Sequence, residues 1–145
     1  MSEPTETPIW TPGPGATQDA IDALRRAAPI ELPSAYLEQL RRSNGGEGDL
    51  AVEPGWIVFW PAEEVIENNQ GYEVEQWVPG LFGFGSNGGG ELLAFDTREG
   101  QPFPIVMVPF IPMELEEAVV IAKDFAELLR HLGRSADAGP GRRLA

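Results

Sequence analysis

Cysteine is absent from this chain of 145 residues. Its absence excludes a disulfide-stapled secreted scaffold, a thiolate nucleophile and a cysteine-based zinc site. The longest apolar run, Trp56 to Trp60, is far shorter than the roughly 20 residues that a membrane helix needs. The opening residues Met-Ser-Glu-Pro lack the basic start and apolar run of a signal peptide. We therefore expect a cytoplasmic protein without a membrane segment.

Basic residues are scarce. Ten Lys and Arg stand against 23 Asp and Glu, which gives a net charge of −13 at pH 7. Such a surface repels phosphate backbones and anionic lipids, so we expect no direct binding to nucleic acid or membrane.

Histidine is nearly absent as well. His131 stands alone near the end of a predicted helix, where a cation complements the negative helix terminus. A lone histidine does not favour a metal site, and we expect no metal and no other cofactor. A Ser-His-Asp triad drawn from distant residues stays open, but no residue pattern points to one.

The remaining composition is that of a globular protein. Hydrophobic residues make up 42% and charged residues 23%, and the length suits one domain. Four prolines within the first 14 residues predict a flexible lead over residues 1–16, from which Ile9 and Trp10 are suited to fold back onto the domain. The Gly-Pro-Gly sequence at 139–141 predicts a flexible tail over 134–145. The ordered domain is therefore expected over 17–133.

Apolar spacing predicts helices near both ends of the chain and strands between them. Thr17 is suited to cap a helix over 17–28, and two more helices are expected over 33–42 and 61–66. Apolar residues recur at helical spacing from about 114 to 132, which predicts one long last helix. Antiparallel strands are predicted over 50–52, 56–60, 74–78, 92–95 and 105–110. Separate blocks of helices and strands favour an α+β fold in a single domain.

The segment from Gly83 to Gly88 matches the G-x-G-x-x-G spacing of dinucleotide-binding loops. Those loops bind a pyrophosphate at the N-terminus of the helix that follows. Here a strand pattern, 91–95, follows, and no acid lies about 20 residues further on to bind a ribose. The segment therefore predicts a glycine-rich turn that enters a strand and not a nucleotide site.

Acidic residues gather in short runs along the chain. Carboxylate pairs can act as acid and base in glycoside cleavage, but such pairs are identified by their separation in space. A solvated acidic surface is the interpretation that charge runs favour.

Residues 72–77 combine acids with a tryptophan. If they form a strand, alternate residues share a face, so Glu73, Glu75 and Trp77 project together. An aromatic side chain beside charges is typical of protein interfaces. The alternative, equally open, is that Trp77 covers the edge of the core beside solvated acids.

Four segments, in this order and spacing, resemble the SUKH superfamily, whose best-known branch is the SMI/KNR domain. The most specific of them is Gly-Gly-Gly-Glu at 88–91, followed by Phe95 and Asp96. Family members often have a serine before the phenylalanine of the last helix, where this chain has Ala122-Lys123; the difference predicts a helix that begins earlier, near Glu114. The four segments are 32–37 with 43–48, 59–65, 84–96 and 121–129.

The resemblance implies an α+β domain in which helices from both termini pack on a twisted, mostly antiparallel sheet. It also implies a non-enzymatic role. Bacterial members of the superfamily are chiefly immunity proteins that neutralise polymorphic toxins, with nucleases and deaminases prominent among them, and eukaryotic relatives are regulatory interaction modules. In these folds the glycine triplet is more simply explained by backbone conformation than by a site, so we expect Gly89 to hold a strained conformation or a close packing contact.

We therefore predict an immunity protein whose acidic face blocks the basic cleft of a toxin. A regulatory adaptor with no toxin partner is the alternative, and a small-molecule binder or carboxylate-based hydrolase is a third. The sequence leaves the oligomeric state open. The predicted partner-binding residues are Glu73, Glu75 and Trp77, followed by Glu63, Glu64 and Glu67.

Overall fold

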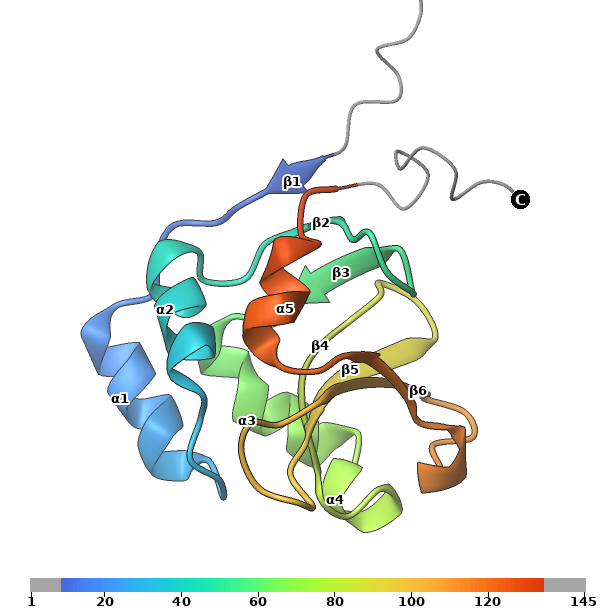
Figure 1. The fold of residues 1–145 in the computed structure, drawn as a ribbon. Helices are drawn as coiled ribbons and strands as arrows, with labels where there is room; N and C mark the ends of the chain where they lie inside the picture. The colour runs from blue at the N-terminus through green and yellow to red at the C-terminus, as the bar shows by residue number, and fades with distance from the viewer. Residues whose placement is uncertain (1–8, 135–145) are drawn as a thin grey trace, which may run out of the picture.

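The computed structural model describes residues 9–134, which contain one seven-stranded sheet. The strands lie side by side in the order of the sequence, and every neighbouring pair is antiparallel (Figure 1). The predicted α+β fold with an antiparallel sheet is thus confirmed. The strands are β1 Trp10–Thr11, β2 Glu47–Asp49, β3 Trp56–Phe59, β4 Leu81–Ser86, β5 Glu91–Asp96, β6 Ile105–Pro109 and β7 Val119–Ala122.

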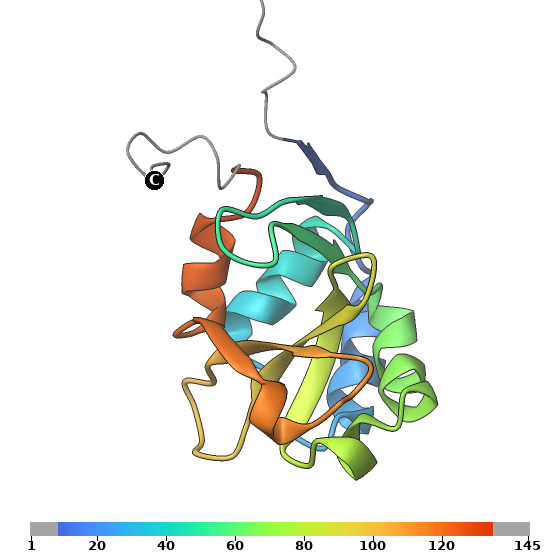
Figure 2. The same ribbon diagram turned by 90° about the vertical axis from the view of Figure 1, so that its right-hand side faces the viewer.

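Helices from both ends of the chain pack together beside this sheet. Along the series α5, α2, α1 and α3 each helix contacts the next, and α3 contacts β4. Figures 1 and 2 show this series as an arc against one side of the sheet. The helices are α1 Gln18–Ala27, α2 Ser34–Arg42, α3 Ala62–Gly71, α4 Val74–Trp77 and α5 Phe125–Arg130, with a 3₁₀ turn, η2, at Leu115–Glu117.

Local signals set the ends of the first two helices. Thr17 caps α1, because its Oγ1 accepts a hydrogen bond from the backbone N–H of Ala20 at 3.1 Å. Beyond α2 the chain turns through Gly45 and Gly46, whose φ angles of +93° and +102° favour glycine. Between Ser43 and Gly45, Asn44 accepts from the N–H of Ala62 at 2.7 Å and so satisfies a donor at the start of α3.

Aromatic rings fill the centre of the core. Tyr36 of α2 lies between Phe84, Phe95 and Phe125, with ring centroids 5.3 to 5.9 Å away. Its side chain is fully buried, and its hydroxyl has no hydrogen-bond partner among the described residues. Burial raises the pKa of Tyr36 far above the ordinary tyrosine value.

Residues 9–16 differ from the predicted lead. Trp10 and Thr11 pair with Gly48 and Glu47 as the edge strand β1, and the indole of Trp10 meets the ring of Phe59 edge-on at 5.9 Å. Trp10 reaches the core from this stretch, and its packing on Phe59 explains why residues near it pair with the sheet. Residues 1–8 and 135–145 lie outside the described residues, and the boundaries at 17 and 133 stay predictions.

Two predicted elements are wrong in type, and one is displaced. Residues 74–77 form helix α4 and not a strand; the buried residues of this segment are Val74 and Val78, four apart as on a helix. The long last helix is instead η2, β7 and α5. The strand expected over 50–52 is β2 at 47–49, while Leu50 makes an isolated bridge to Leu132.

The last helix begins late because Asp124 caps it. Its Oδ1 accepts from the N–H of Glu127 at 2.8 Å, and the carboxylate of Glu127 accepts from the N–H of Lys123 at 2.7 Å. The first bond is an N-cap, and the second resembles that of a capping box but goes to the N–H of the residue before the cap; together they fix the helix start. The earlier start that the missing serine suggested, near Glu114, is therefore wrong. His131 lies at the C-cap of α5, at the helix end where it was predicted.

Candidate partner-binding site

The glycine-rich segment is a strand and turn. Gly83 and Gly85 belong to β4, and β5 follows the turn, so no helix N-terminus is present there to receive a phosphate. A Cβ on Gly85 would lie 2.5 Å from the carbonyl oxygen of Val58 on the neighbouring strand. Gly88 has a φ of +80°, whereas Gly89 has neither a positive φ nor a close neighbour, so the strain expected at Gly89 is wrong. The motif builds the fold, as predicted.

An asparagine fastens α3 to β4. The side-chain oxygen of Asn69 accepts from the N–H of Gly83 at 2.8 Å, and its amide donates to the carbonyl of Gly83 at 2.9 Å. The same amide donates to the carbonyl of Val65 at 2.8 Å. Glu73 then adopts a left-handed conformation, with a φ of +57°, and turns the chain from α3 into α4. These contacts fix α3 against β4, and the turn at Glu73 sets the direction in which α4 follows.

An apolar groove lies between α4 and the segment that follows β6. In Figure 2 this segment, in orange, approaches α4 at the lower end of the molecule. Tyr72 stacks on Phe110 with ring centroids 4.5 Å apart, while Trp77 is 54% exposed and Ile111 91% exposed. The groove has a volume of about 460 Å³, and we call it the apolar groove; it is lined by Tyr72, Trp77, Phe110, Ile111, Pro112, Met113 and Glu114.

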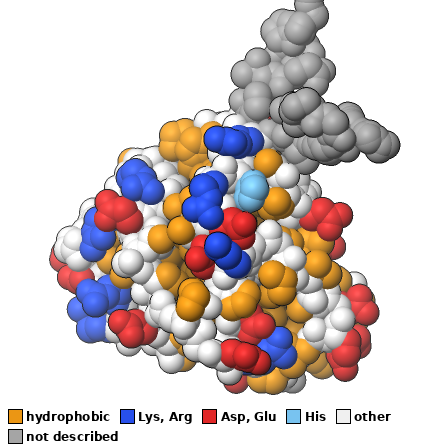
Figure 3. Space-filling model, in the orientation of Figure 1, with side chains coloured by type: hydrophobic (Ala, Val, Ile, Leu, Met, Phe, Trp, Pro, Cys, Tyr) orange, Lys and Arg blue, Asp and Glu red, His pale blue; other side chains and the backbone are white. Residues whose placement is uncertain are grey.

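The charge around this groove has one sign. Residues 43–97, which include α3 and α4, contain ten Asp and Glu and no Lys or Arg. The described basic residues are concentrated instead in α1, α2 and α5. In Figure 3, basic side chains lie over these helices, whereas the right-hand edge of the view shows carboxylates and no basic side chain. The acidity of the protein is therefore uneven.

Glu73 and Trp77 lie side by side. The indole N–H of Trp77 donates to Oε1 of Glu73 at 3.2 Å, across the four residues that one helical turn spans. The prediction that these two side chains lie together is right, although the strand that was its reason does not exist. Glu75 is not on the same face as Trp77, because it lines a second hollow on the other side of α4.

The remaining predicted residues lie on α3. Glu63 and Glu64 are in its first turn and Glu67 in its middle, and all three are exposed. Asn44 donates to Oε1 of Glu63 at 2.9 Å, and this hydrogen bond lowers the pKa of Glu63. At a rise of about 1.5 Å per residue, the first turn of α3 lies roughly 15 Å from Glu73. The five predicted acids and Trp77 thus do not form one cluster, and their part in binding stays a prediction.

The family follows from a comparison with protein families. A sequence model described as the SMI1 / KNR4 family (SUKH-1) matches residues 15–131, the range from α1 to α5. The chain belongs to the SMI1/KNR4 family. Domains of this family bind partner proteins and are generally non-enzymatic. A comparison with curated proteins found no match.

Sequence reasoning missed three residues of the apolar groove in this SMI1/KNR4 domain. A strand over 72–77 would put Tyr72 on the face opposite Trp77, and the strand predicted over 105–110 ends at Phe110. Ile111 lies one residue beyond that predicted strand. The signal available in the sequence is the apolar run 110–113, which contains a proline. Because a proline does not continue a central strand, these apolar side chains belong to a loop, where they are free to form a surface groove.

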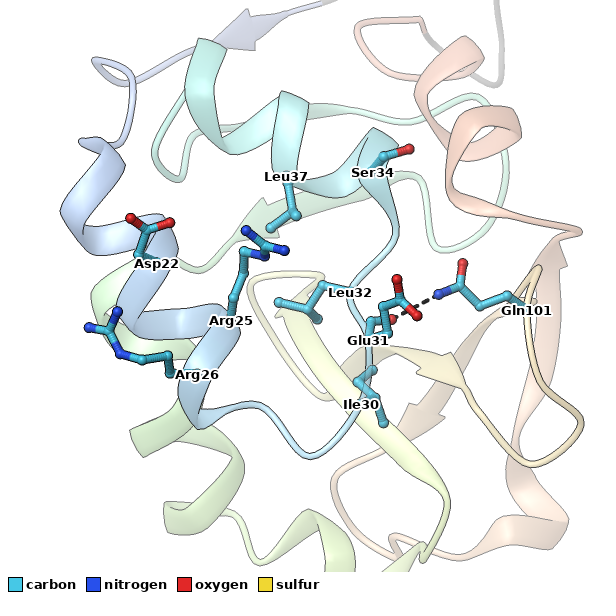
Figure 4. Close-up of a pocket in the computed structure, with 9 residues that line it drawn as sticks. All are labelled: Asp22, Arg25, Arg26, Ile30, Glu31, Leu32, Ser34, Leu37 and Gln101. Carbon is cyan, nitrogen blue, oxygen red and sulfur yellow. Dashed lines mark hydrogen bonds between the residues drawn. The ribbon is translucent and has the colours of Figure 1, made fainter.

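A hollow of about 630 Å³ between α1 and α2 has a mixed lining. Its charged residues are two acids and two bases, Asp22, Glu31, Arg25 and Arg26, so neither positive nor negative charge predominates in the lining. Figure 4 shows the side chains of Arg25 and Arg26 pointing in different directions, and one hydrogen bond, from Nε2 of Gln101 to the carbonyl oxygen of Glu31 at 2.9 Å. This arrangement does not favour a binding site in the SMI1/KNR4 domain.

Within residues 9–134, no three His, Asp or Glu side chains gather in a way that could hold a metal ion. None of the helices in this range has the length and apolarity needed to cross a membrane.

Proposed function

We propose that this SMI1/KNR4 domain is an immunity protein that acts in the cytoplasm by covering the basic cleft of a toxin domain. The observation that carries the proposal is the apolar groove, where Trp77 and Ile111 are exposed. One wall of the groove, α4, belongs to the stretch 43–97, which has no basic residue. A nuclease must hold phosphates with cationic side chains, so its cleft is the electrostatic complement of this region.

The groove has the composition of a binding interface. Exposed apolar patches on a single domain mark interaction sites, and a few aromatic anchors carry most of the binding energy of an interface. Trp77 is suited to this role because its hydrogen bond to Glu73 holds the indole in place before binding. The carboxylates around it would then select a cationic partner.

Binding and protection can be tested together. Proteins captured by the tagged domain in its native cell are identified by mass spectrometry, and each captured domain is expressed alone in a host cell. We expect one captured domain to be toxic and the co-expressed immunity protein to restore growth. Trp77→Ala and Ile111→Ser should each weaken binding by about tenfold or more and reduce protection.

A matched control removes an exposed apolar side chain elsewhere. Val120 of β7 is 61% exposed and does not line the apolar groove, so Val120→Ser should protect as well as the wild type. Captured partners that are all harmless would favour a regulatory adaptor and overturn the immunity role. Full protection by Trp77→Ala and Ile111→Ser would remove the groove from the interface.

A further inference from the structure

A second hollow lies on the other side of α4. It has a volume of about 620 Å³ and is bounded by the connection between α1 and α2, by α3, by α4 and by β4. Its apolar lining includes the buried side chains of Leu81 and Phe82 together with Ile30 and Ile66, and its carboxylates are Glu73 and Glu75. We call this hollow the acidic pocket.

Neither carboxylate of the acidic pocket belongs to an ion pair within residues 9–134. The ion pairs found among residues 9–134 join Arg41 and Arg42 to Glu38, and Arg98 to Asp96. Two basic residues adjoin lining residues of the pocket in sequence, Arg26 beside Ala27 and Arg98 beside Thr97. Arg26 lines the hollow between α1 and α2, and the guanidinium of Arg98 is held by both oxygens of Asp96 at 2.9 Å. The charge of Glu73 and Glu75 is therefore left for a partner.

The pocket combines the features that an arginine side chain requires. Arginine has an apolar stem that packs on hydrophobic surface and a planar guanidinium with five donors that fits carboxylates in a bidentate way. Here the stem would contact the half-buried Ile30 and Ile66, and the guanidinium would reach Glu73 and Glu75, which are exposed. A lysine offers one compact charge without this planar fit.

The acidic pocket and the apolar groove are adjacent. Glu73 lines the pocket, and its Oε1 accepts from Trp77, which lines the groove, so only α4 separates the two hollows. A protein surface that covers Trp77 therefore also reaches the pocket. From this continuity and the charge complementarity we infer that the acidic pocket receives an arginine side chain of the partner protein whose apolar side chain fills the groove. The identity of that partner rests on the proposed function.

The pocket can be probed without the partner. The probe is N-acetyl-L-arginine amide, titrated into ¹⁵N-labelled protein while the amide resonances of 69–82 are followed by NMR. We expect saturable shifts that centre on these residues. The citrulline analogue, which has the same shape without the charge, should bind about tenfold more weakly.

Two variants test the carboxylates. Glu75→Gln and Glu73→Gln should each weaken probe binding by about tenfold, whereas Glu47→Gln, which removes the same charge on β2, should leave it unchanged. Absence of saturable shifts, equal binding of the citrulline analogue, or equal losses with Glu47→Gln would overturn the inference and leave the groove proposal standing.

A last measurement separates a partner's arginine from a free small cation. With the captured toxin domain, Glu75→Gln should weaken binding by about tenfold. If the probe binds the pocket but Glu75→Gln binds the toxin domain normally, the pocket is a site for a free cation and the inference is wrong. If no toxic partner exists while the probe still binds, the proposed function fails separately.

Discussion

The indole of Trp77 is bound to the carboxylate of Glu73 at 3.2 Å, and Glu73 is the one non-glycine residue with a positive φ among residues 9–134. A left-handed conformation costs a non-glycine side chain free energy, and such strain is retained where the surrounding structure needs it. Here the strained residue Glu73, just before α4, places its carboxylate against the exposed Trp77 at the end of α4.

Replacing Glu73 with glycine should separate stability from binding. Glu73→Gly relieves the left-handed strain, so we expect the free energy of unfolding to rise by about 0.5–1 kcal/mol in urea denaturation. The same change removes the acceptor of the Trp77 indole and should weaken partner binding. Glu73→Ala is the control, because it also removes the acceptor but keeps the strain. A loss of stability in Glu73→Gly would show that the carboxylate supports the fold.

The buried hydroxyl of Tyr36 makes a prediction about pH. Its pKa is raised in the folded state, so the unfolded chain loses this proton at a lower pH, near 10, than the folded chain does. The stability contributed by the neutral form is therefore fully present below pH 10 and is lost as pH rises further, by about 1.4 kcal/mol per pH unit.

Tyr36→Phe should remove this alkaline loss. The substitution also deletes a buried polar group without a partner, so stability at pH 7 should not fall and should rise by about 1 kcal/mol. Urea denaturation at pH 7 and between pH 10 and 11 measures both effects. An unchanged slope in Tyr36→Phe would show that another group causes it.

Two glycines of the glycine-rich motif should respond in opposite ways to alanine. Gly85→Ala places a Cβ 2.5 Å from a backbone oxygen of β3, which cannot move without disturbing the sheet, so we expect a loss of about 2 kcal/mol or more. Gly89→Ala meets nothing closer than 3.6 Å and should be neutral or slightly stabilising. Thermal unfolding compares the two, and equal losses would contradict the geometry.

The parts of the fold that sequence predicted depend on local signals. The cap at Thr17 marks the start of α1, and the glycine turn at Gly45-Gly46 follows the end of α2. Both signals lie within a few residues of the helix end that they mark, so these ends could be predicted from sequence. The cap formed by Asp124 and Glu127 is equally local, but the apolar stripe around it suggests a continuous helix. That stripe fits two elements, because Val119 and Val120 are on a strand.

The candidate site was less predictable because its parts are distant in sequence. Tyr72 and Phe110 are in contact although β4, β5 and β6 lie between them in the sequence. The pairing of Trp10 with Gly48 and Phe59 is non-local in the same way. Glu73 and Trp77 could be singled out, since their chemistry is visible in sequence, but the groove beside them requires the fold.

Salt should affect how fast the protein meets its partner more than how long it stays bound. The carboxylates of 43–97 attract a basic cleft at long range, and raising ionic strength from about 0.01 to 0.15 M shortens the Debye length from ~30 to ~8 Å. The association rate constant should therefore fall by about tenfold, measured by stopped flow with the captured toxin domain. Dissociation depends on close contacts such as that of Trp77, so Trp77→Ala should raise its rate.

Charge reversal locates the attraction. Glu73→Lys combined with Glu75→Lys should slow association beyond the matched double reversal Glu47→Lys with Glu53→Lys, because both pairs change the net charge equally but only the first flanks α4. An association rate that does not respond to salt would refute electrostatic steering. Equal slowing by both double variants would show that the attraction comes from the net charge and not from the carboxylates near α4. Normal binding by the Glu73→Lys, Glu75→Lys variant would move the interface towards Glu63, Glu64 and Glu67, because those carboxylates lie in the same acidic region but on α3, away from α4.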